Sequence, residues 1–161
     1  MDSEVFLNDL WSVYFHNPIS NDWKRTGYIK IADVSTVQEF WKIFGCISPN
    51  IHNGMWFVMR EHIFPSWDDP SNKNGSFLSF KVLKDDVVEF SKNLLVRLLG
   101  ETMFTDDCIG KWDSVNGISF SPKKNFSIIK IWLNSQDVKD KAMFNLPPNY
   151  QGEVIFKDNN F

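Results

Sequence analysis

The first third of the chain alternates apolar and polar residues with a period of two. The apolar members of this pattern are Trp11, Val13, Phe15, Ile29 and Ile31. Successive side chains of a strand point to opposite faces, so the alternation predicts strands with one face buried. Further apolar runs predict strands over residues 55–60, 77–82, 108–112, 118–120, 126–133 and 153–157. Between them we expect a long polar loop at 64–75 and turns at 116–117 and 121–125.

Two segments carry their apolar residues at helical spacing instead. Residues 35–39 offer two overlapping capping boxes, and an apolar stripe continues from there to Phe44. Residues 85–100 open with two aspartates, carry a longer apolar face and close at Gly100, a natural helix stop. A third, short helix is predicted over residues 137–143. Together these elements predict an α+β fold, an antiparallel sheet with two or three helices.

Length and charge narrow the class of protein. A chain of 161 residues is enough for one domain with a core of its own, so we expect a single domain over residues 1–161. The net charge of -3 and a pI near 5.6 argue against a protein that holds long nucleic acid by its phosphates, whereas a short nucleotide ligand stays compatible.

The cysteines and the N-terminus bear on where the protein acts. Cys46 and Cys108 show no CxxC spacing, and the first residues lack the basic start and apolar stretch of a signal peptide. No apolar run is long enough to span a membrane. We therefore expect a reduced, intracellular and cytoplasmic protein that does not enter a membrane.

Two of the seven tryptophans lie in polar loops rather than in apolar runs. Trp23 stands in the sequence NDWK, and Trp67 stands in PSWDD, directly before Asp68. The ordinary alternative is a half-buried surface aromatic, but exposed indoles are unfavourable unless they are used. Two loop indoles beside a carboxylate indicate an aromatic clamp for a flat, cationic ligand.

Motifs for catalysis are weak in this sequence. His16, His52 and His62 lack metal-ligand spacing, and no nucleophile elbow or phosphate-binding loop is present. Aspartate pairs occur at 68–69, 85–86 and 106–107, and the last two are more typical of solvated or helix-capping residues. We predict a protein that is not an enzyme and uses no metal or cofactor. The alternative is a cap- or nucleotide-hydrolysing protein that uses these aspartates with a divalent metal.

Several segments in a fixed order point to a known family. They are WSVYF at 11–15, Trp23, STVQEFW at 35–41, PSWDD at 65–69, LLVRLLGE at 94–101 and IKIW at 129–132. In this order and spacing the chain resembles the eukaryotic translation initiation factor 4E family, the messenger RNA cap-binding proteins. The resemblance runs from about Trp11 to Pro148, nearly the whole chain.

The resemblance implies a curved antiparallel sheet with helices on its convex face and a cap-binding cleft on the concave face. Trp23 and Trp67 match the two tryptophans that stack 7-methylguanine, and Trp132 matches the tryptophan that faces the methyl group, although a core role for Trp132 is locally plausible too. Methylation at N7 gives guanine a positive charge, which strengthens stacking between indoles. Asp68 stands where the family has a glutamate that accepts hydrogen bonds from the Watson–Crick edge of the base.

The chain departs from the family pattern where the cap phosphates bind. Ser76 replaces one arginine, and the second arginine falls on Asn116 or Ser121, according to where the extra residues of this segment are placed. Lys123 and Lys124, in the turn that follows, are the nearest substitutes. Lys73 is a further candidate, and ordinary solvated lysines are the alternative in each case.

The resemblance also implies a partner-binding surface. Val37 and Trp41 match the residues that the family presents to the scaffold factor 4G and to competing 4E-binding proteins, although Trp41 also fits the buried stripe of its helix. Lys92–Asn93 and Val5–Phe6 differ from the family at this surface. We predict a monomeric factor that binds the 7-methylguanosine cap and recruits capped mRNA for translation initiation. The alternatives are a cap-binding repressor or decoy with altered scaffold binding, and an interaction scaffold that has lost cap binding. A viral or otherwise fast-evolving source would account for the divergence.

Overall fold

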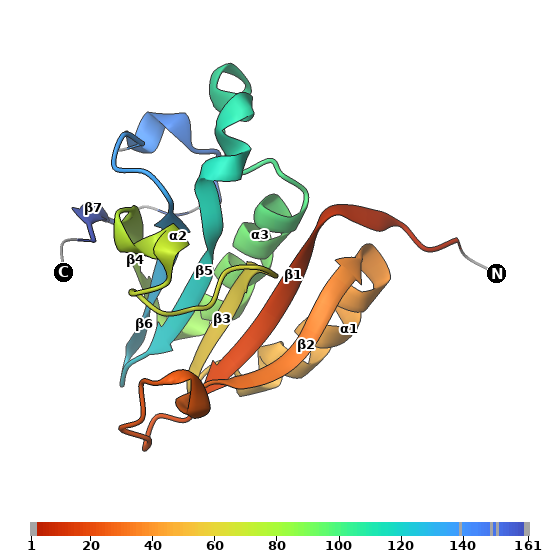
Figure 1. The fold of residues 1–161 in the computed structure, drawn as a ribbon, viewed down its shortest axis with the longest axis vertical. Helices are drawn as coiled ribbons and strands as arrows, with labels where there is room; N and C mark the ends of the chain where they lie inside the picture. The colour runs from red at the N-terminus through yellow and green to blue at the C-terminus, as the bar shows by residue number, and fades with distance from the viewer. Residues whose placement is uncertain (1–2, 139, 149, 151, 160–161) are drawn as a thin grey trace.

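The computed structural model describes residues 3–138, 140–148, 150 and 152–159. Within these ranges seven strands form one antiparallel sheet in the order β2-β1-β3-β5-β6-β4-β7 (Figure 1). The strands are β1 (Phe6–His16), β2 (Ile29–Thr36), β3 (Met55–Arg60), β4 (Ser76–Leu83), β5 (Val115–Pro122), β6 (Phe126–Leu133) and β7 (Val154–Asp158). The predicted antiparallel α+β fold is confirmed.

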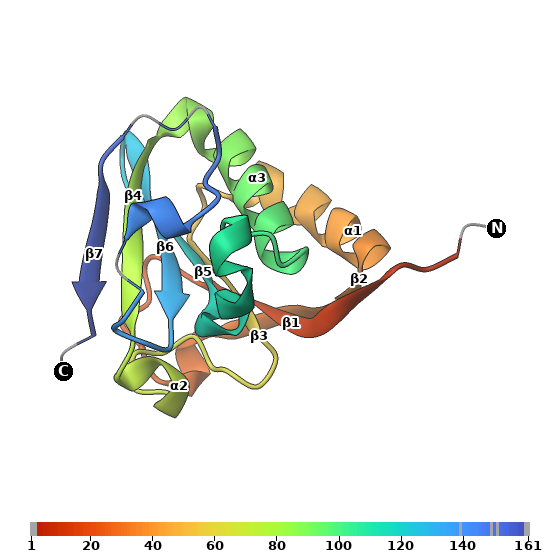
Figure 2. The ribbon, with the colours of Figure 1, turned by 90° about the horizontal axis from the view of Figure 1, so that it is seen from above.

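Helices α1 (Val37–Ile47) and α3 (Val87–Leu99) cover one face of the sheet, and Figure 2 shows them side by side. The short helix α2 (Pro70–Lys73) lies on the opposite side, at the end of the loop that follows β3. The expected placement of the longer helices on the convex face is therefore confirmed. The remaining turns are the 3-10 helices η1 (Arg25–Gly27), η2 (Ser48–Asn50), η3 (Lys84–Asp86), η4 (Asp106–Ser114) and η5 (Lys141–Met143).

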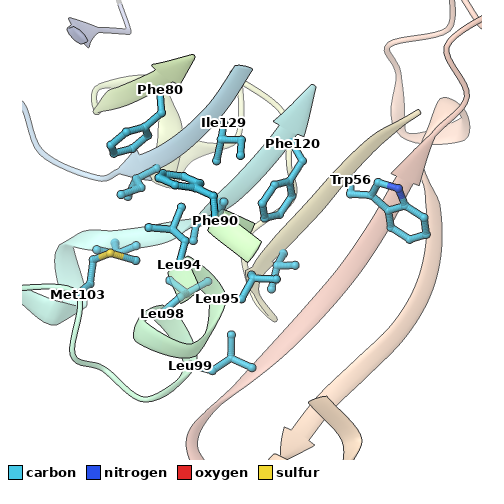
Figure 3. Close-up of a cluster of buried hydrophobic side chains, with 14 of the residues drawn as sticks. Trp56, Phe80, Phe90, Leu94, Leu95, Leu98, Leu99, Met103, Phe120 and Ile129 are labelled. Carbon is cyan, nitrogen blue, oxygen red and sulfur yellow. The ribbon is translucent and has the colours of Figure 1, made fainter. Parts of the chain in front are cut away.

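The main core lies between α3 and the sheet. Four leucines of α3 point toward the strands, where they meet large side chains of β4, β5 and β6 (Figure 3). These buried residues are Leu94, Leu95, Leu98, Leu99, Phe80, Phe120 and Ile129. Their removal from water is the chief force that holds the helix to the sheet. A second, smaller cluster on the other face contains Tyr14, Phe57, Met59 and Ile63, and it supports the loops described below.

The two long helices begin and end close to the predicted residues. The Thr36 hydroxyl accepts a hydrogen bond from the Glu39 amide, which is half of a capping box, while the Glu39 carboxylate accepts from the Thr36 hydroxyl rather than from its backbone N–H. Helix α3 ends at Gly100 as predicted, but the left-handed conformation belongs to the next residue, Glu101, with φ of 59°. Gly100 is therefore the C-cap in a right-handed conformation, and the left-handed residue follows it.

The prediction of strands with one buried face is wrong in two places. On β1, the Ser12, Tyr14 and His16 side chains are buried like their apolar neighbours, because the second cluster and the loop after β1 cover that face. Ile29 and Ile31 were expected to face the core, yet both are exposed. They lie in the first half of the edge strand β2, whereas the residues of β2 that are buried, Val34 and Thr36, lie in its second half, next to α1.

Three further predictions are corrected by the structure. Residues 108–112 are not a strand but part of η4. The predicted turn at 116–117 lies inside β5, where a register shift falls between Val115 and Gly117. A Cβ atom at Gly117 would come within 2.4 Å of the Val58 carbonyl oxygen, so this glycine permits a close approach of β3 rather than a turn. Of the helix expected over 137–143, only η5 forms in the described residues.

Neither cysteine is in a disulfide. In the described part of the chain, the helices are all too short or too polar to cross a membrane.

Candidate functional site

Loops from two distant parts of the sequence meet over the sheet face opposite α3. The loop after β1 and the loop after β3 together line a cavity of about 320 Å³. Its lining residues are Trp23, Lys24, Arg25, Phe64, Ser66, Asp68, Asp69 and Pro70. The structure thus brings Trp23 and Asp68 to one site, although 45 residues separate them in sequence. Both predicted clamp tryptophans are half exposed, Trp23 at 53% and Trp67 at 47%.

Trp23 is held from behind by a buried histidine. The His16 imidazole stacks on the Trp23 indole with ring centroids 3.8 Å apart and planes within 5°. The same histidine donates a hydrogen bond from Nε2 to the Asp22 carbonyl oxygen, at 2.9 Å, so it fixes both the ring and the backbone that carries it. Tyr28 adds edge contacts to both rings. One face of Trp23 is therefore occupied by protein, and the other is available to a ligand.

A buried asparagine anchors the loop that carries Trp67 and Asp68. Asn72 is fully buried, and its amide nitrogen donates to the carbonyl oxygens of Phe64, at 3.1 Å, and Ser66, at 2.8 Å. Its own side-chain oxygen accepts from Asn116 of β5, at 2.8 Å. The Asp69 carboxylate adds hydrogen bonds from the amides of Phe64 and Ser71. These contacts tie both ends of the short segment around Trp67 to the sheet.

Replacing Asn72 by alanine should release this loop. The substitution removes the three hydrogen bonds of the buried Asn72 side chain, two to carbonyl oxygens and one from the Asn116 amide, at a cost of about 1–3 kcal/mol. We expect faster hydrogen exchange at the amides of residues 66–75, with the exchange of β6 unchanged. Asn145→Ala is the matched control, because this exposed amide makes a single hydrogen bond, to the Thr102 carbonyl. If the loop amides exchanged at the same rate in Asn72→Ala and in wild type, Asn72 would not be the residue that anchors the loop.

The charged residues that line the cavity are the carboxylates Asp68 and Asp69 and the cations Lys24 and Arg25. The Ser66 hydroxyl donates to Asp68 Oδ1, which orients the carboxylate. Burial, followed by the nearby charge of Asp68, raises the pKa of Tyr28 to about 12, so this phenol stays protonated beneath the site. Across the cavity, the Arg25 guanidinium lies 4.1 Å from the centre of the Phe64 ring. Sequence reasoning missed Tyr28 and Arg25, because neither stands out by type or spacing in a polar loop.

Trp132 lies on the same face of the sheet but does not line the cavity. Its indole nitrogen donates to the Ser119 hydroxyl at 2.9 Å, and its ring packs with the cluster that includes Phe57 and Phe64. Lys130, two residues earlier on β6, shares this face, and its ammonium lies 4.3 Å from the centre of the Phe77 ring. Burial, then the positive charges of Lys157 and Lys123, lower the pKa of Lys130.

Lys130 was not among the predicted phosphate-binding residues. Its position two residues before Trp132 on a predicted strand could have indicated that the two side chains share a face. The predicted candidates Lys123 and Lys124 are exposed in the turn between β5 and β6, and Lys73 is exposed at the end of α2. Only Lys123 is near enough to Lys130 to affect its charge. Lys130 and Lys157 thus lie on the same face of the sheet as Trp132, and Lys123 lies in the turn between β5 and β6.

Two of the residues that replace arginines of the family pattern are buried. Ser76 donates from its hydroxyl to the Ser135 carbonyl oxygen at 2.6 Å. Asn116 donates to the Ser71 carbonyl as well as to Asn72. Neither side chain reaches the cavity, so both have structural partners in place of a ligand.

The predicted partner-binding residues lie on α1, on the opposite face of the molecule. Phe40 and Phe44 are buried, but Trp41 is 46% exposed and touches them with the edge or face of its ring. Val37 is partly buried in the first turn. Trp41 is thus not a core residue, so the alternative that it belongs to the buried stripe of α1 is wrong.

A larger cavity, of about 630 Å³, lies between the start of α3 and a segment that contributes Pro147, Pro148, Tyr150 and Gly152. It contains no tryptophan, and its charged groups Lys81, Asp86 and Glu89 come from other segments than those of the clamp. The aspartate pairs are also dispersed: Asp69 caps α2, while 85–86 and 106–107 are exposed in η3 and η4. In the described residues they do not gather into a group of three or more metal-binding side chains.

Comparisons with known proteins agree with this arrangement. A sequence model of the family described as "Eukaryotic initiation factor 4E" matches residues 6–146. Eukaryotic translation initiation factor 4E of Saccharomyces cerevisiae is 28% identical over 140 residues, which cover 81% of this chain and 62% of the yeast protein. Initiation factor 4E-2 of Schizosaccharomyces pombe is 30% identical over 146 residues, 84% of this chain and 57% of that protein. The chain thus spans less than two thirds of these relatives.

A solved structure extends the likeness to the fold. A schistosome eIF4E complexed with m7GpppA and 4E-BP superposes with a TM-score of 0.73 and 27% identity, covering 85% of this chain and 75% of that one. The family match covers most of the sequence, including Trp23, Trp67, Asp68 and Trp132. On these grounds the chain belongs to the eukaryotic initiation factor 4E family.

Proposed function

We propose that this chain binds the 7-methylguanosine cap of mRNA and recruits capped messages for translation initiation, without catalysing a reaction. The observation that carries the proposal is the cavity lined by Trp23 and Asp68, with Trp67 half exposed on the same loop as Asp68. A methylated guanine is flat and cationic, so it suits a site made of indole faces and a carboxylate. We further propose that residues 1–161 act as a single cap-binding domain in the cytoplasm, where translation takes place.

The base would stack on the free face of Trp23. Because His16 already stacks on the other face, this ring is fixed in place before the ligand arrives, which lowers the entropy lost on binding. Trp67 lies on the same loop as Asp68 and is half exposed, and in this proposal its indole covers the other side of the base. Asp68 would accept hydrogen bonds from the Watson–Crick edge of guanine, and the Ser66 hydroxyl holds its carboxylate for that contact.

The cap phosphates would run from this cavity toward β6. Lys130 and Lys123 take the place of the missing arginines in this proposal, since Lys130 lies on the face that carries Trp132 and the charge of Lys123 acts on it. An ammonium that is partly buried and close to other cations gains from a bound anion. Lys124 extends into solvent beside Lys123, and Lys73 lies at the end of α2, so both are secondary candidates for this role.

The convex face supports a second part of the proposal. The yeast relatives are initiation factors, and the schistosome structure contains 4E-BP, which is consistent with a scaffold factor 4G-like or 4E-binding protein as partner. Val37 and the exposed Trp41 would contact it. On α3, Lys92 pairs with Glu89 at 2.9 Å, and Asn93 binds the same glutamate, so these residues are engaged within the helix. This altered surface favours a different scaffold or a repressor role as the second candidate.

The decisive test is a tryptophan fluorescence titration with 7-methyl-GTP and with GTP. We expect quenching by both nucleotides, with 7-methyl-GTP bound at least tenfold more tightly, because the methylated base alone carries a positive charge. Asp68→Asn should weaken binding of 7-methyl-GTP by about tenfold or more, since the amide replaces a charged acceptor. The absence of binding by either nucleotide would refute cap binding and leave the interaction scaffold as the remaining function.

A further inference from the structure

The sheet face next to the proposed cap site is rich in lysine. The strands β5, β6, β4 and β7, with the turn that joins the first two, contain five lysines and one carboxylate, Asp158. The lysines are Lys81, Lys123, Lys124, Lys130 and Lys157. The whole chain has more acidic than basic residues, 20 against 17, so this excess of positive charge is local. In the described residues, none of the three ion pairs of the protein involves these lysines.

Aromatic and apolar side chains lie between the lysines. The register of the sheet places Trp132 on β6 opposite Phe77 on β4, and Phe77 opposite Lys157 on β7. Lys130 extends over the Phe77 ring. Ile155, two residues before Lys157 on the same face, is 51% exposed. A row of Trp132, Phe77 and Lys157 therefore leads from the cap site to the outer edge of the sheet.

We propose that this row is the path of the RNA chain beyond the cap, with Lys157 binding a phosphate downstream of the cap triphosphate. The inference rests on the proposed function and extends it to the nucleotides that follow the cap. Single-stranded RNA is bound by grooves that combine cations for the phosphates with aromatic side chains for the bases, which is the composition of this face.

The two ends of the lysine-rich face are not equivalent. At the Lys81 end, Glu153 directly precedes β7, and Asp86 and Glu89 lie in the cavity that Lys81 lines. At the Lys157 end, Asp158 is opposite Ser76 in the sheet, so its side chain alternates to the other face. The RNA would therefore leave the sheet at Lys157, where its phosphates meet no carboxylate of β4, β6 or β7 on this face.

The test compares three ligands by fluorescence anisotropy or quenching over a series of salt concentrations. They are 7-methyl-GTP, a capped unstructured oligoribonucleotide of about ten nucleotides, and the same oligonucleotide without a cap. We expect Lys157→Gln to weaken binding of the capped RNA by about threefold to tenfold and to reduce the slope of log K against log salt by about 0.7, as for one lost phosphate contact. Binding of 7-methyl-GTP should change by less than about twofold, because Lys157 affects the triphosphate only through its charge near Lys130.

Two variants separate this inference from the proposed function. Lys130→Gln should weaken 7-methyl-GTP and capped RNA alike, because it lies at the triphosphate. Lys42→Gln, an exposed lysine on α1, is the matched control and should change neither. If 7-methyl-GTP binds but Lys157→Gln leaves capped RNA unaffected, the path is wrong and cap binding stands. If 7-methyl-GTP does not bind, the uncapped RNA decides: binding that depends on Lys157 supports the path, and binding that does not overturns it.

Discussion

Trp67→Ala should abolish most of the preference for a methylated cap. The substitution removes one of the two stacking surfaces, which is worth about 1–3 kcal/mol per base, or roughly a 5- to 150-fold loss of affinity for 7-methyl-GTP. The loss for GTP should be smaller, because the neutral base gains less from the electron-rich indole face. The ratio of the two dissociation constants, measured by isothermal titration calorimetry, should therefore fall toward one.

Trp41→Ala provides a matched control for this result. Trp41 and Trp67 are exposed to nearly the same extent, 46% and 47%, but they lie on opposite faces of the molecule. Trp41→Ala should leave both nucleotide affinities unchanged while removing apolar surface from the proposed partner face. If Trp67→Ala lowered the affinities for 7-methyl-GTP and GTP by the same factor, stacking on a cationic base would not be the basis of recognition.

The elements of the fold that local periodicity describes well were predicted from the sequence. Strand β6 was predicted with its observed bounds, because it is an apolar run that follows a clear turn sequence. Helix α1 was found from its capping box and its apolar stripe. The segment 108–112 was predicted as a strand from its composition, but there the Trp112 carbonyl binds Arg60 and the chain turns in η4. Such a long-range contact leaves no local signal.

The candidate site, too, could be predicted only in part from the sequence. Trp23, Trp67 and Asp68 could be predicted because indoles and an acid in polar loops are unusual, and the family pattern assigned them roles. The residues that support them could not. The alternation along β1 predicts His16 on the outer face of the strand, whereas it lies under Trp23, and Asn72 is one polar residue among many in its loop. Their function depends on partners far away in sequence, which only the folded chain brings together.

Arg60, the last residue of β3, is a buried cation whose guanidinium contacts two aromatic rings, two carbonyl groups and a carboxylate. The side chain is 4% exposed, and its guanidinium carbon lies 4.6 Å from the centre of the Trp11 ring and 4.8 Å from that of Trp112. It donates to the Val115 carbonyl at 2.7 Å, to the Trp112 carbonyl at 3.0 Å and to Asp9 Oδ2 at 2.5 Å. The single guanidinium thus contacts aromatic rings, backbone carbonyl groups and a carboxylate from different parts of the chain.

Arg60→Met should therefore destabilise the protein strongly. It leaves the Asp9 carboxylate without its cation and removes the hydrogen bonds to the Val115 and Trp112 carbonyl oxygens, for which we expect a loss of about 3–5 kcal/mol in the free energy of unfolding. Urea denaturation followed by circular dichroism measures this loss. Arg60→Lys keeps the charge but not the forked geometry of the guanidinium. Its free energy of unfolding should therefore lie between those of wild type and Arg60→Met.

The exposed pair of Lys30 and Asp33, whose charged atoms lie 2.9 Å apart, is the control for Arg60. Lys30→Met also removes one partner of an ion pair, yet both of its side chains are about half exposed and water can replace the missing charge. We expect a loss below about 1 kcal/mol for this variant. If Arg60→Met cost no more than Lys30→Met, the guanidinium would not be the link that ties η4 and β5 to the end of β3, and the burial of Trp11 and Trp112 would have to hold that edge alone.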